Sequence, residues 1–161
     1  MIELRLPWPV SANRYWRSFV PKGHKRAIVV LSDEAKLYKR QVSEIAMVSG
    51  MGECLEGRVL VEVKLYPALP QDAARRMRKI GEGWDDTVRS IDLDNALKVT
   101  IDALNGIAYR DDKQVWKLTA QRMEPIGDAC AIVRILEIQP EPMQPRLDFI
   151  QEGENNELVS I

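Results

Sequence analysis

Residues 91–106 read IDLDNALKVTIDALNG, and Arg110-Asp111-Asp112 follow after three more residues. The larger apolar residues of this segment recur at steps of four, four and three, a spacing that predicts one face of a helix from Asp94 onward. Asn105-Gly106 is a plausible C-terminal stop for this helix. The periodicity therefore predicts an amphipathic helix packed on a core, with Leu93 pointing inward. The apolar stripe consists of Leu93, Leu97, Ile101 and Leu104.

The polar residues of the same segment predict a metal site that acts on phosphate. Asp92 and Asp94 alternate around Leu93 at the start of the helix, where the macrodipole favours ionised carboxylates. Mg²⁺ prefers oxygen ligands and is usually held by a few carboxylates together with water and substrate phosphate. Asp92, Asp94 and Asp112 supply such a set. Lys98, one turn beyond Asp94, is placed to offset their charge or to contact a phosphate oxygen.

Each of these residues also has an ordinary structural explanation. An aspartate before a helix is a common N-cap, and Asp94, Lys98 and Asp102 have the spacing of a solvated ion-pair ladder. Asp111-Asp112 has the composition of a hairpin turn. These explanations account for one carboxylate at a time, whereas a metal site accounts for the whole set with its lysine. The residues alone leave both interpretations open.

The segment resembles the signature of the RusA family of Holliday junction resolvases, in which a D-x-D-N-x-x-K-x-x-x-D-A-L helix precedes a D-D-x-Q-V segment. Here the first motif runs from Asp92 to Leu104 and the second from Asp111 to Val115. LPWPVSANRYWR at residues 6–17 is similar to the family's N-terminal L-P-W-P-P-S-x-N-R-Y-Y-R strand and loop. The N-terminal motif and the signature at residues 92–115 stand in the same order as in the family, which argues against chance similarity, and the resemblance extends over about residues 2–138.

The resemblance implies an α+β fold, a single domain in which a mixed β-sheet packs with two main helices. It implies a Mg²⁺-dependent endodeoxyribonuclease, with Mn²⁺ as an alternative ion, that cuts branched four-way junction DNA as a homodimer. The implied catalytic residues are Asp92, Asp94 and Asp112, which hold the metal, and Lys98, while Asp102, Asp111 and Asn95 orient them. The family pattern has an arginine directly before its first aspartate. Here Ile91 takes that position, with Arg89 two residues earlier.

The remaining periodicity outlines the rest of the domain. Alternating or β-rich runs predict strands at residues 2–6, 27–31, 58–65, 114–122 and 129–138, and Ser32 is a suitable N-cap for a helix to about Val48. Residues 67–90 show no regular pattern, which leaves a DNA-contacting loop and a disordered insertion as equal alternatives. We expect a nuclease domain over residues 1–139 and an acidic, proline-containing flexible tail over residues 140–161.

The charge distribution favours a nucleic-acid partner although the net charge of the chain is only −1. Residues 1–40 carry nine Lys or Arg and three acidic residues, whereas residues 137–161 carry one Arg and six acidic residues. An ordinary basic surface is the competing interpretation. Tyr15 and Trp16 either stack on an unpaired base or form the core edge of a hairpin. The predicted DNA-binding residues are Asn13, Arg14, Tyr15, Trp16, Arg17, Lys22, Lys25, Arg26, Arg76 and Arg89.

Composition excludes several other kinds of site. Cys54 and Cys130 lack the spacing of a zinc site and predict free, buried thiols. His24 is the only histidine, which argues against histidine-based acid–base chemistry. No apolar run reaches 18 residues, so we expect a cytoplasmic protein without a membrane segment.

Two other functions use the same residues. A Mg²⁺-dependent nuclease or phosphohydrolase of different substrate preference would need the same carboxylates. A DNA-binding module without catalysis would keep the basic N-terminal face but would not need the acids.

Overall fold

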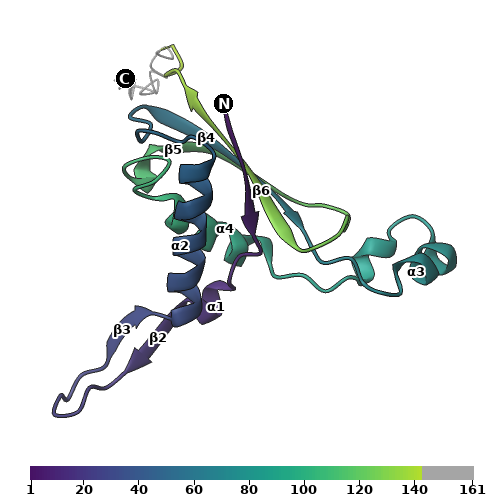
Figure 1. Cartoon of the computed structure of the whole chain (residues 1–161), viewed down its shortest axis with the longest axis horizontal. Coiled ribbons are helices and arrows are strands. Elements are labelled where there is room, and N and C mark those ends of the chain that lie inside the picture. Colours follow the sequence, from purple (N-terminus) through teal and green to yellow (C-terminus); the bar gives the residue numbers. More distant parts are fainter. Residues whose placement is uncertain (143–161) are drawn as a thin grey trace, which may run out of the picture.

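Four strands form the central sheet of the structure, a computed structural model that describes residues 1–142 (Figure 1). Strand β6 is antiparallel to both of its neighbours, whereas β4 and β5 are parallel, so the sheet is mixed. These strands lie where the alternation of the sequence predicts them, and the α+β architecture with a mixed sheet is confirmed. In spatial order the strands are β1 (Ile2–Pro7), β6 (Cys130–Ile138), β4 (Arg58–Tyr66) and β5 (Val115–Arg122).

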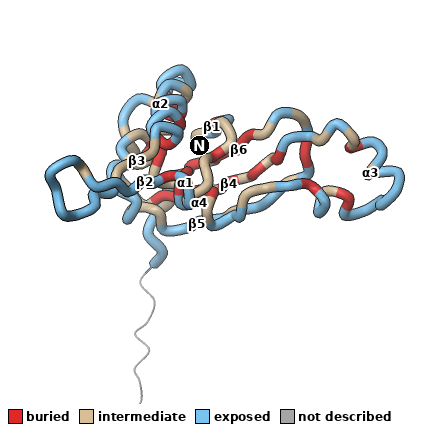
Figure 2. The backbone as a smooth tube through the Cα atoms, turned by 90° about the horizontal axis from the view of Figure 1, so that it is seen from below, coloured by how far each residue is buried: buried red, intermediate tan, exposed pale blue. Residues whose placement is uncertain are grey.

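The core lies between one face of this sheet and two helices, α2 (Asp33–Val48) and α4 (Leu93–Leu104) (Figure 2). Alternation along β4 buries every second side chain completely, from Val59 to Leu65. Helix α2 begins where Ser32 predicts it, because the Ser32 Oγ accepts a hydrogen bond from the Ala35 amide at 3.1 Å. The two main helices are therefore held on the sheet by apolar burial.

Helix α4 is rotated relative to its predicted orientation. It starts at Leu93, one residue earlier than expected, with Asp92 at the N-cap position. Leu93 is 37% exposed, so the prediction that it points to the core is wrong. The buried face of the helix instead consists of Ala96, Val99, Thr100, Ala103 and Leu104. Leu97 and Ile101 of the predicted stripe are only partly buried against the core.

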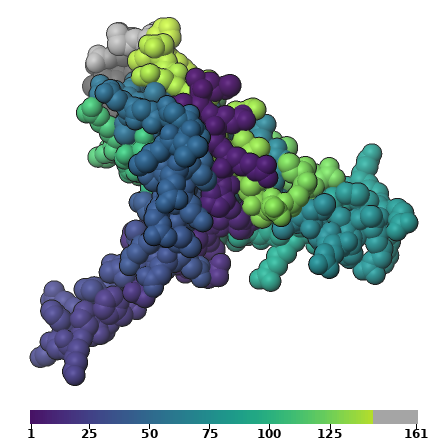
Figure 3. Space-filling view, viewed as in Figure 1, coloured from purple at the N-terminus to yellow at the C-terminus, as the bar shows by residue number. Residues whose placement is uncertain are grey.

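A β-hairpin extends from the domain beside the N-terminus of α2 (Figures 1 and 3). The short helix α1 (Ala12–Tyr15) leads into β2 (Trp16–Phe19), which pairs antiparallel with β3 (Ile28–Leu31). The return strand expected at residues 27–31 is thus confirmed. We call residues 16–31 the hairpin arm.

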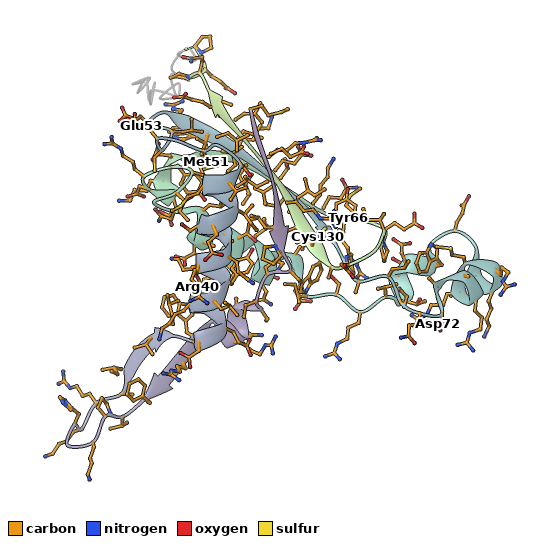
Figure 4. All side chains as sticks on the ribbon, in the orientation of Figure 1. Arg40, Met51, Glu53, Tyr66, Asp72 and Cys130 are labelled. Carbon is orange, nitrogen blue, oxygen red and sulfur yellow. The ribbon has the colours of Figure 1, made fainter. Side chains whose placement is uncertain are left out.

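Residues 70–90 form a second projection, which we call the α3 module. It contains helix α3 (Ala73–Ile80) and the 3₁₀ helix η1 (Trp84–Thr87), so the expectation of no regular structure here is wrong. Asp72, labelled in Figure 4, accepts hydrogen bonds from Arg75 at 2.9 Å and from Arg76 at 2.8 Å. A small apolar cluster of Ala73, Trp84 and Val88 completes the module.

Both cysteines are free, as predicted. Cys130 is buried at the start of β6, beside its strand partner Tyr66 (Figure 4), whereas Cys54 is only half-buried. None of the helices in the described part of the chain is long and apolar enough to span a bilayer. The acidic tail expected at residues 140–161 lies almost wholly outside the described residues.

Candidate active site

Helices α1 and α4 together border two cavities that contain most of the predicted site residues. The first, which we call the acidic pocket, has a volume of about 270 Å³, and the second, the basic cleft, has a volume of about 690 Å³. The acidic pocket is lined by Ala12, Tyr15, Trp16, Lys98, Val99, Ile101, Asp102 and Asp112. The basic cleft is lined by Trp8, Ser11, Asn13, Arg14, Ala68, Arg89, Ser90, Ile91, Asp92, Asn95 and Ala129.

Asp92 occupies the N-cap position of α4 but does not act as a cap. Its side chain accepts no hydrogen bond from a backbone amide in the first turn of the helix. Its Oδ2 instead accepts a hydrogen bond from the Asn95 Nδ2 at 3.3 Å, which orients the carboxylate. An N-cap aspartate normally uses its oxygen on the N2 or N3 amide. The exposed carboxylate of Asp92 therefore keeps its oxygen atoms available for a ligand in the basic cleft.

Asp102 is held by two residues from distant parts of the chain. The Tyr15 hydroxyl donates a hydrogen bond to Asp102 Oδ2, and the Lys39 ammonium lies 3.1 Å from the same oxygen. Burial, followed by this hydrogen bond, raises the pKa of Tyr15 well above its usual value, so the phenol stays protonated as a donor. These contacts attach α1 and α2 to α4 at the wall of the acidic pocket.

Lys98 does not belong to the ion-pair ladder that its spacing allows. Asp102 pairs with Lys39, and within residues 1–142 Lys98 takes part in no ion pair. The exposed ammonium group of Lys98 lines the acidic pocket together with Asp112. A cation in this position can interact with an anionic substrate.

The second acidic motif is built by Gln114. The Gln114 side chain donates to the carbonyls of Leu55 and Gly57, both at 2.9 Å, and accepts from the amides of Arg110 and Asp111. Asp111 caps η2 (Asp112–Gln114) through the Lys113 amide, and this hydrogen bond lowers the pKa of the Asp111 carboxyl. The segment is therefore not a hairpin turn. It is a braced loop that leaves Asp112 exposed.

The three predicted metal ligands are not gathered into one cluster. Asp92 lines the basic cleft, Asp112 lines the acidic pocket, and Asp94 is exposed in the first turn of α4. Among residues 1–142, no three acidic, histidine or cysteine side chains come close enough to share one metal ion. Carboxylates repel one another when no cation neutralises them. The donor chemistry fits Mg²⁺, which commonly takes one or two carboxylates and completes its shell with water and phosphate.

Eight of the ten predicted DNA-binding residues, all but Tyr15 and Trp16, fall into three groups. Asn13, Arg14 and Arg89 line the basic cleft beside Asp92, so Arg89 reaches the site although Ile91 stands directly before the aspartate. Arg17, Lys22, Lys25 and Arg26 lie on the hairpin arm. Arg76 belongs to the α3 module, where its guanidinium is bonded to Asp72 and to the Thr87 carbonyl.

Tyr15 and Trp16 differ in their exposure. Tyr15 is 3% exposed, which matches the alternative that it forms the core edge of the hairpin and leaves no ring face for base stacking. Trp16 is 48% exposed and packs edge-on against Tyr15, with ring centroids 5.4 Å apart. Of this pair, only Trp16 is accessible to a base.

A family model described as Endodeoxyribonuclease RusA matches residues 7–135, a range that contains every element from α1 to β5. The chain is also similar to the uncharacterized protein YqaN of Bacillus subtilis (strain 168), with 28% identity over 92 residues. That alignment covers 55% of this chain and 65% of YqaN, slightly less than two thirds of the relative's length.

Proposed function

Because the chain belongs to the RusA endodeoxyribonuclease family, we propose that it resolves four-way DNA junctions by metal-dependent hydrolysis of phosphodiester bonds. The observation that supports this most is the position of α4. One helix presents Asp92 and Asn95 to the basic cleft, and Lys98 and Asp102 to the acidic pocket. A phosphate held across α4 would meet carboxylates and cations together.

Asp92, Asp94 and Asp112 would hold the ion, which we propose to be Mg²⁺, with Mn²⁺ as a substitute. When bound, such an ion lowers the pKa of a coordinated water and offsets the charge of the phosphate. The protein contributes acids that are exposed rather than used in ion pairs, and Asn95, which orients Asp92.

The other residues bind and position the substrate. Arg14 and Arg89 bind the DNA backbone beside Asp92, and Arg cations suit phosphate because their donors match its oxygens. Lys98 stabilises negative charge on the phosphate during cleavage. Asp102 and Asp111 keep the two halves of the site in place through the contacts of Tyr15, Lys39 and Lys113.

We further propose a homodimer. A four-way junction has two symmetry-related strands to cut, and two copies related by a two-fold axis match that substrate. Paired active sites would produce symmetric nicks with ligatable ends.

The test compares a synthetic four-way junction with a linear duplex, each incubated with the purified protein in Mg²⁺ and in EDTA. We expect paired nicks in the junction, little cutting of the duplex, and none in EDTA. Asp92→Asn, Asp94→Asn and Asp112→Asn should each lower the cleavage rate by about 100-fold or more, since each removes a ligand charge. Junction binding should be retained or stronger, because repulsion from phosphate falls.

Asp128→Asn is the matched control, since Asp128 is an exposed aspartate in the loop before β6. The Asp128→Asn variant should cleave the junction at the same rate as the unmodified protein. Full activity in all three site variants would exclude the metal site. Equal cutting of junction and duplex, or a monomer in sedimentation, would mean that the protein is a general nuclease and not a resolvase. DNA binding without any Mg²⁺-dependent cleavage would mean that the protein is a DNA-binding module without catalytic activity.

A further inference from the structure

The hairpin arm exposes apolar side chains on both of its faces. In the β2–β3 register, Phe19 is opposite Ile28 on one face and Ser18 is opposite Val29 on the other. Phe19 is 43% exposed, Ile28 44% and Val29 63%, and Val20 just beyond the pair is 58% exposed. Two strands alone are marginally stable in water, and clustered exposed apolar residues mark interaction surfaces. The outer half of the arm therefore has the properties of a binding element.

The charge of the arm indicates what it binds. Residues 16–31 contain four Lys or Arg and no Asp or Glu. Arg17 pairs with Asp33 at its base, whereas Lys22, Lys25 and Arg26 lie in the exposed connection between the strands. Two such arms would repel each other, so a second copy of the arm is a poor partner for it. A polyanion with apolar surfaces between its charges, as in DNA with unstacked bases, matches both properties.

The arm is also continuous with the acidic pocket. Trp16, the first residue of β2, lines that pocket together with Lys98 and Asp112. Phe19 is three residues further along the strand, so it lies about 10 Å from Trp16 at the usual rise per residue. That distance corresponds to about three nucleotides of a DNA strand.

We propose that the hairpin arm is the element that recognises the branch point. Phe19, Val20 and Ile28 insert where base stacking is interrupted, and Lys22, Lys25 and Arg26 hold the converging phosphates. This places the cut within about three nucleotides of the branch. The inference rests on the proposed function. It adds to that function by assigning branch recognition to a segment outside the catalytic residues.

The first experiment shortens the arm in the full chain. Replacing residues 20–27 by Asn-Gly joins Phe19 to Ile28 through a two-residue turn, which suits the last strand pair. Binding is measured in EDTA by fluorescence anisotropy, so the result does not depend on cleavage. We expect junction affinity to fall about tenfold or more, with a smaller effect on duplex affinity. The slope of log K against log salt should become less steep by about 2 to 3.

A triple Ala variant of Arg5, Arg40 and Lys117 is the charge control, because it removes three exposed cations from β1, α2 and β5. It should keep the preference for the junction over the duplex. Circular dichroism and the melting temperature verify that each variant is folded.

The second experiment separates apolar insertion from charge. A junction carries 2-aminopurine at the branch, whose fluorescence rises when the base loses its stacking partner. Phe19→Ser/Val20→Ser should abolish at least half of the rise that the unmodified protein induces. The control Met47→Ser/Val48→Ser, at the end of α2 where these side chains are 71% and 89% exposed, should leave it unchanged.

Three outcomes would overturn the proposal. One is unchanged junction preference in the shortened variant, and another is an unchanged fluorescence rise in the Phe19/Val20 variant. The third is conversion of a dimer to a monomer by shortening, which would make the arm a contact between copies. If the Asp variants lose cleavage while the arm variants bind the junction like the unmodified protein, the proposed nuclease function stands and only the proposed role of the hairpin arm fails. The failure of this inference can therefore be distinguished from the failure of the proposed function.

Discussion

At the scale of single residues, Asp102 shows how the site depends on remote partners. Tyr15 and Lys39, separated from it by 87 and 63 positions, share one of its oxygens. Tyr15 is buried and its pKa is raised, whereas Lys39 is partly exposed, so the tyrosine makes the better shielded contact. Asp102 is thus a positioning residue that fixes α4 against α1.

We predict that Tyr15→Phe weakens the site without unfolding the protein. It removes the hydroxyl donor while keeping the ring, and a hydrogen bond to a charged group contributes about 2 kcal/mol. The melting temperature should fall by a few degrees, and junction cleavage should slow by about tenfold at saturating substrate while KM changes little. Tyr66→Phe on β4 is the control. Identical cleavage rates for the two variants would show that Asp102 needs only Lys39.

At the scale of elements, Asp72 binds two arginines at the start of helix α3. The hydrogen bonds from Arg75 and then Arg76 lower the pKa of Asp72 below its usual value. A carboxyl with a lowered pKa in the folded state contributes stability that is complete above its unfolded pKa of about 4. That contribution disappears as the pH falls through the lower, folded pKa.

We therefore predict that Asp72→Asn loosens α3 at neutral pH, while the unmodified module loosens only in acid below about pH 4. Trypsin should cut the variant faster at the four basic residues of α3, Arg75, Arg76, Arg78 and Lys79. NMR amide signals of residues 73–80 would follow the acid transition. Asp86→Asn in η1 is the control, and equal trypsin sensitivity of both variants would remove Asp72 from its organising role.

Some elements of the fold follow from local sequence patterns, and others do not. The alternation of Val59, Val61 and Val63 predicts β4 because the sheet buries one face, and Ser32 predicts the start of α2. Helix α3 has no such signal, since its larger apolar residues Met77 and Ile80 are exposed. Its stability comes from ion pairs with Asp72 and from Trp84, whose indole nitrogen donates to Glu124 at 2.7 Å.

The candidate site likewise contains residues that local motifs predict and contacts that no local pattern predicts. Asp92 and Lys98 belong to one local motif, so their positions on α4 follow from spacing along the chain. Asp112 belongs to a second local motif, but its position depends on Gln114, which donates to the distant carbonyls of Leu55 and Gly57. The partnership of Tyr15 and Lys39 with Asp102 comes from packing between helices, which no local pattern encodes. The stripe of large apolar residues does not mark the buried face of α4, because that face is formed mainly by Ala96, Val99 and Ala103, and Leu93 in the first turn lies outside it.

At the scale of the whole molecule, stability is concentrated in the sheet and its two helices. Val133 on β6 is fully buried between Leu4 and Val63, its partners on β1 and β4, whereas Val29 on the hairpin arm is 63% exposed. The same substitution at the two positions compares the core with the projection.

We predict that Val133→Ala lowers the free energy of unfolding by about 2 kcal/mol, since it leaves a cavity in a packed layer. Val29→Ala should change it by less than about 0.5 kcal/mol. Urea titration followed by circular dichroism measures both. Similar losses in the two variants would mean that the hairpin arm is packed as firmly as the core.

The position of β6 also determines when this protein can fold during its synthesis. Strand β1, which is made before the other described strands, pairs in the main sheet with β6, which is made after all of them. On the ribosome, β4 and β5 can pair early, but β1 waits until residue 138 has left the exit tunnel. Helix α4 packs on the sheet that this last strand completes. A nascent chain therefore carries all its acidic motifs for some time before it has a finished surface to hold them.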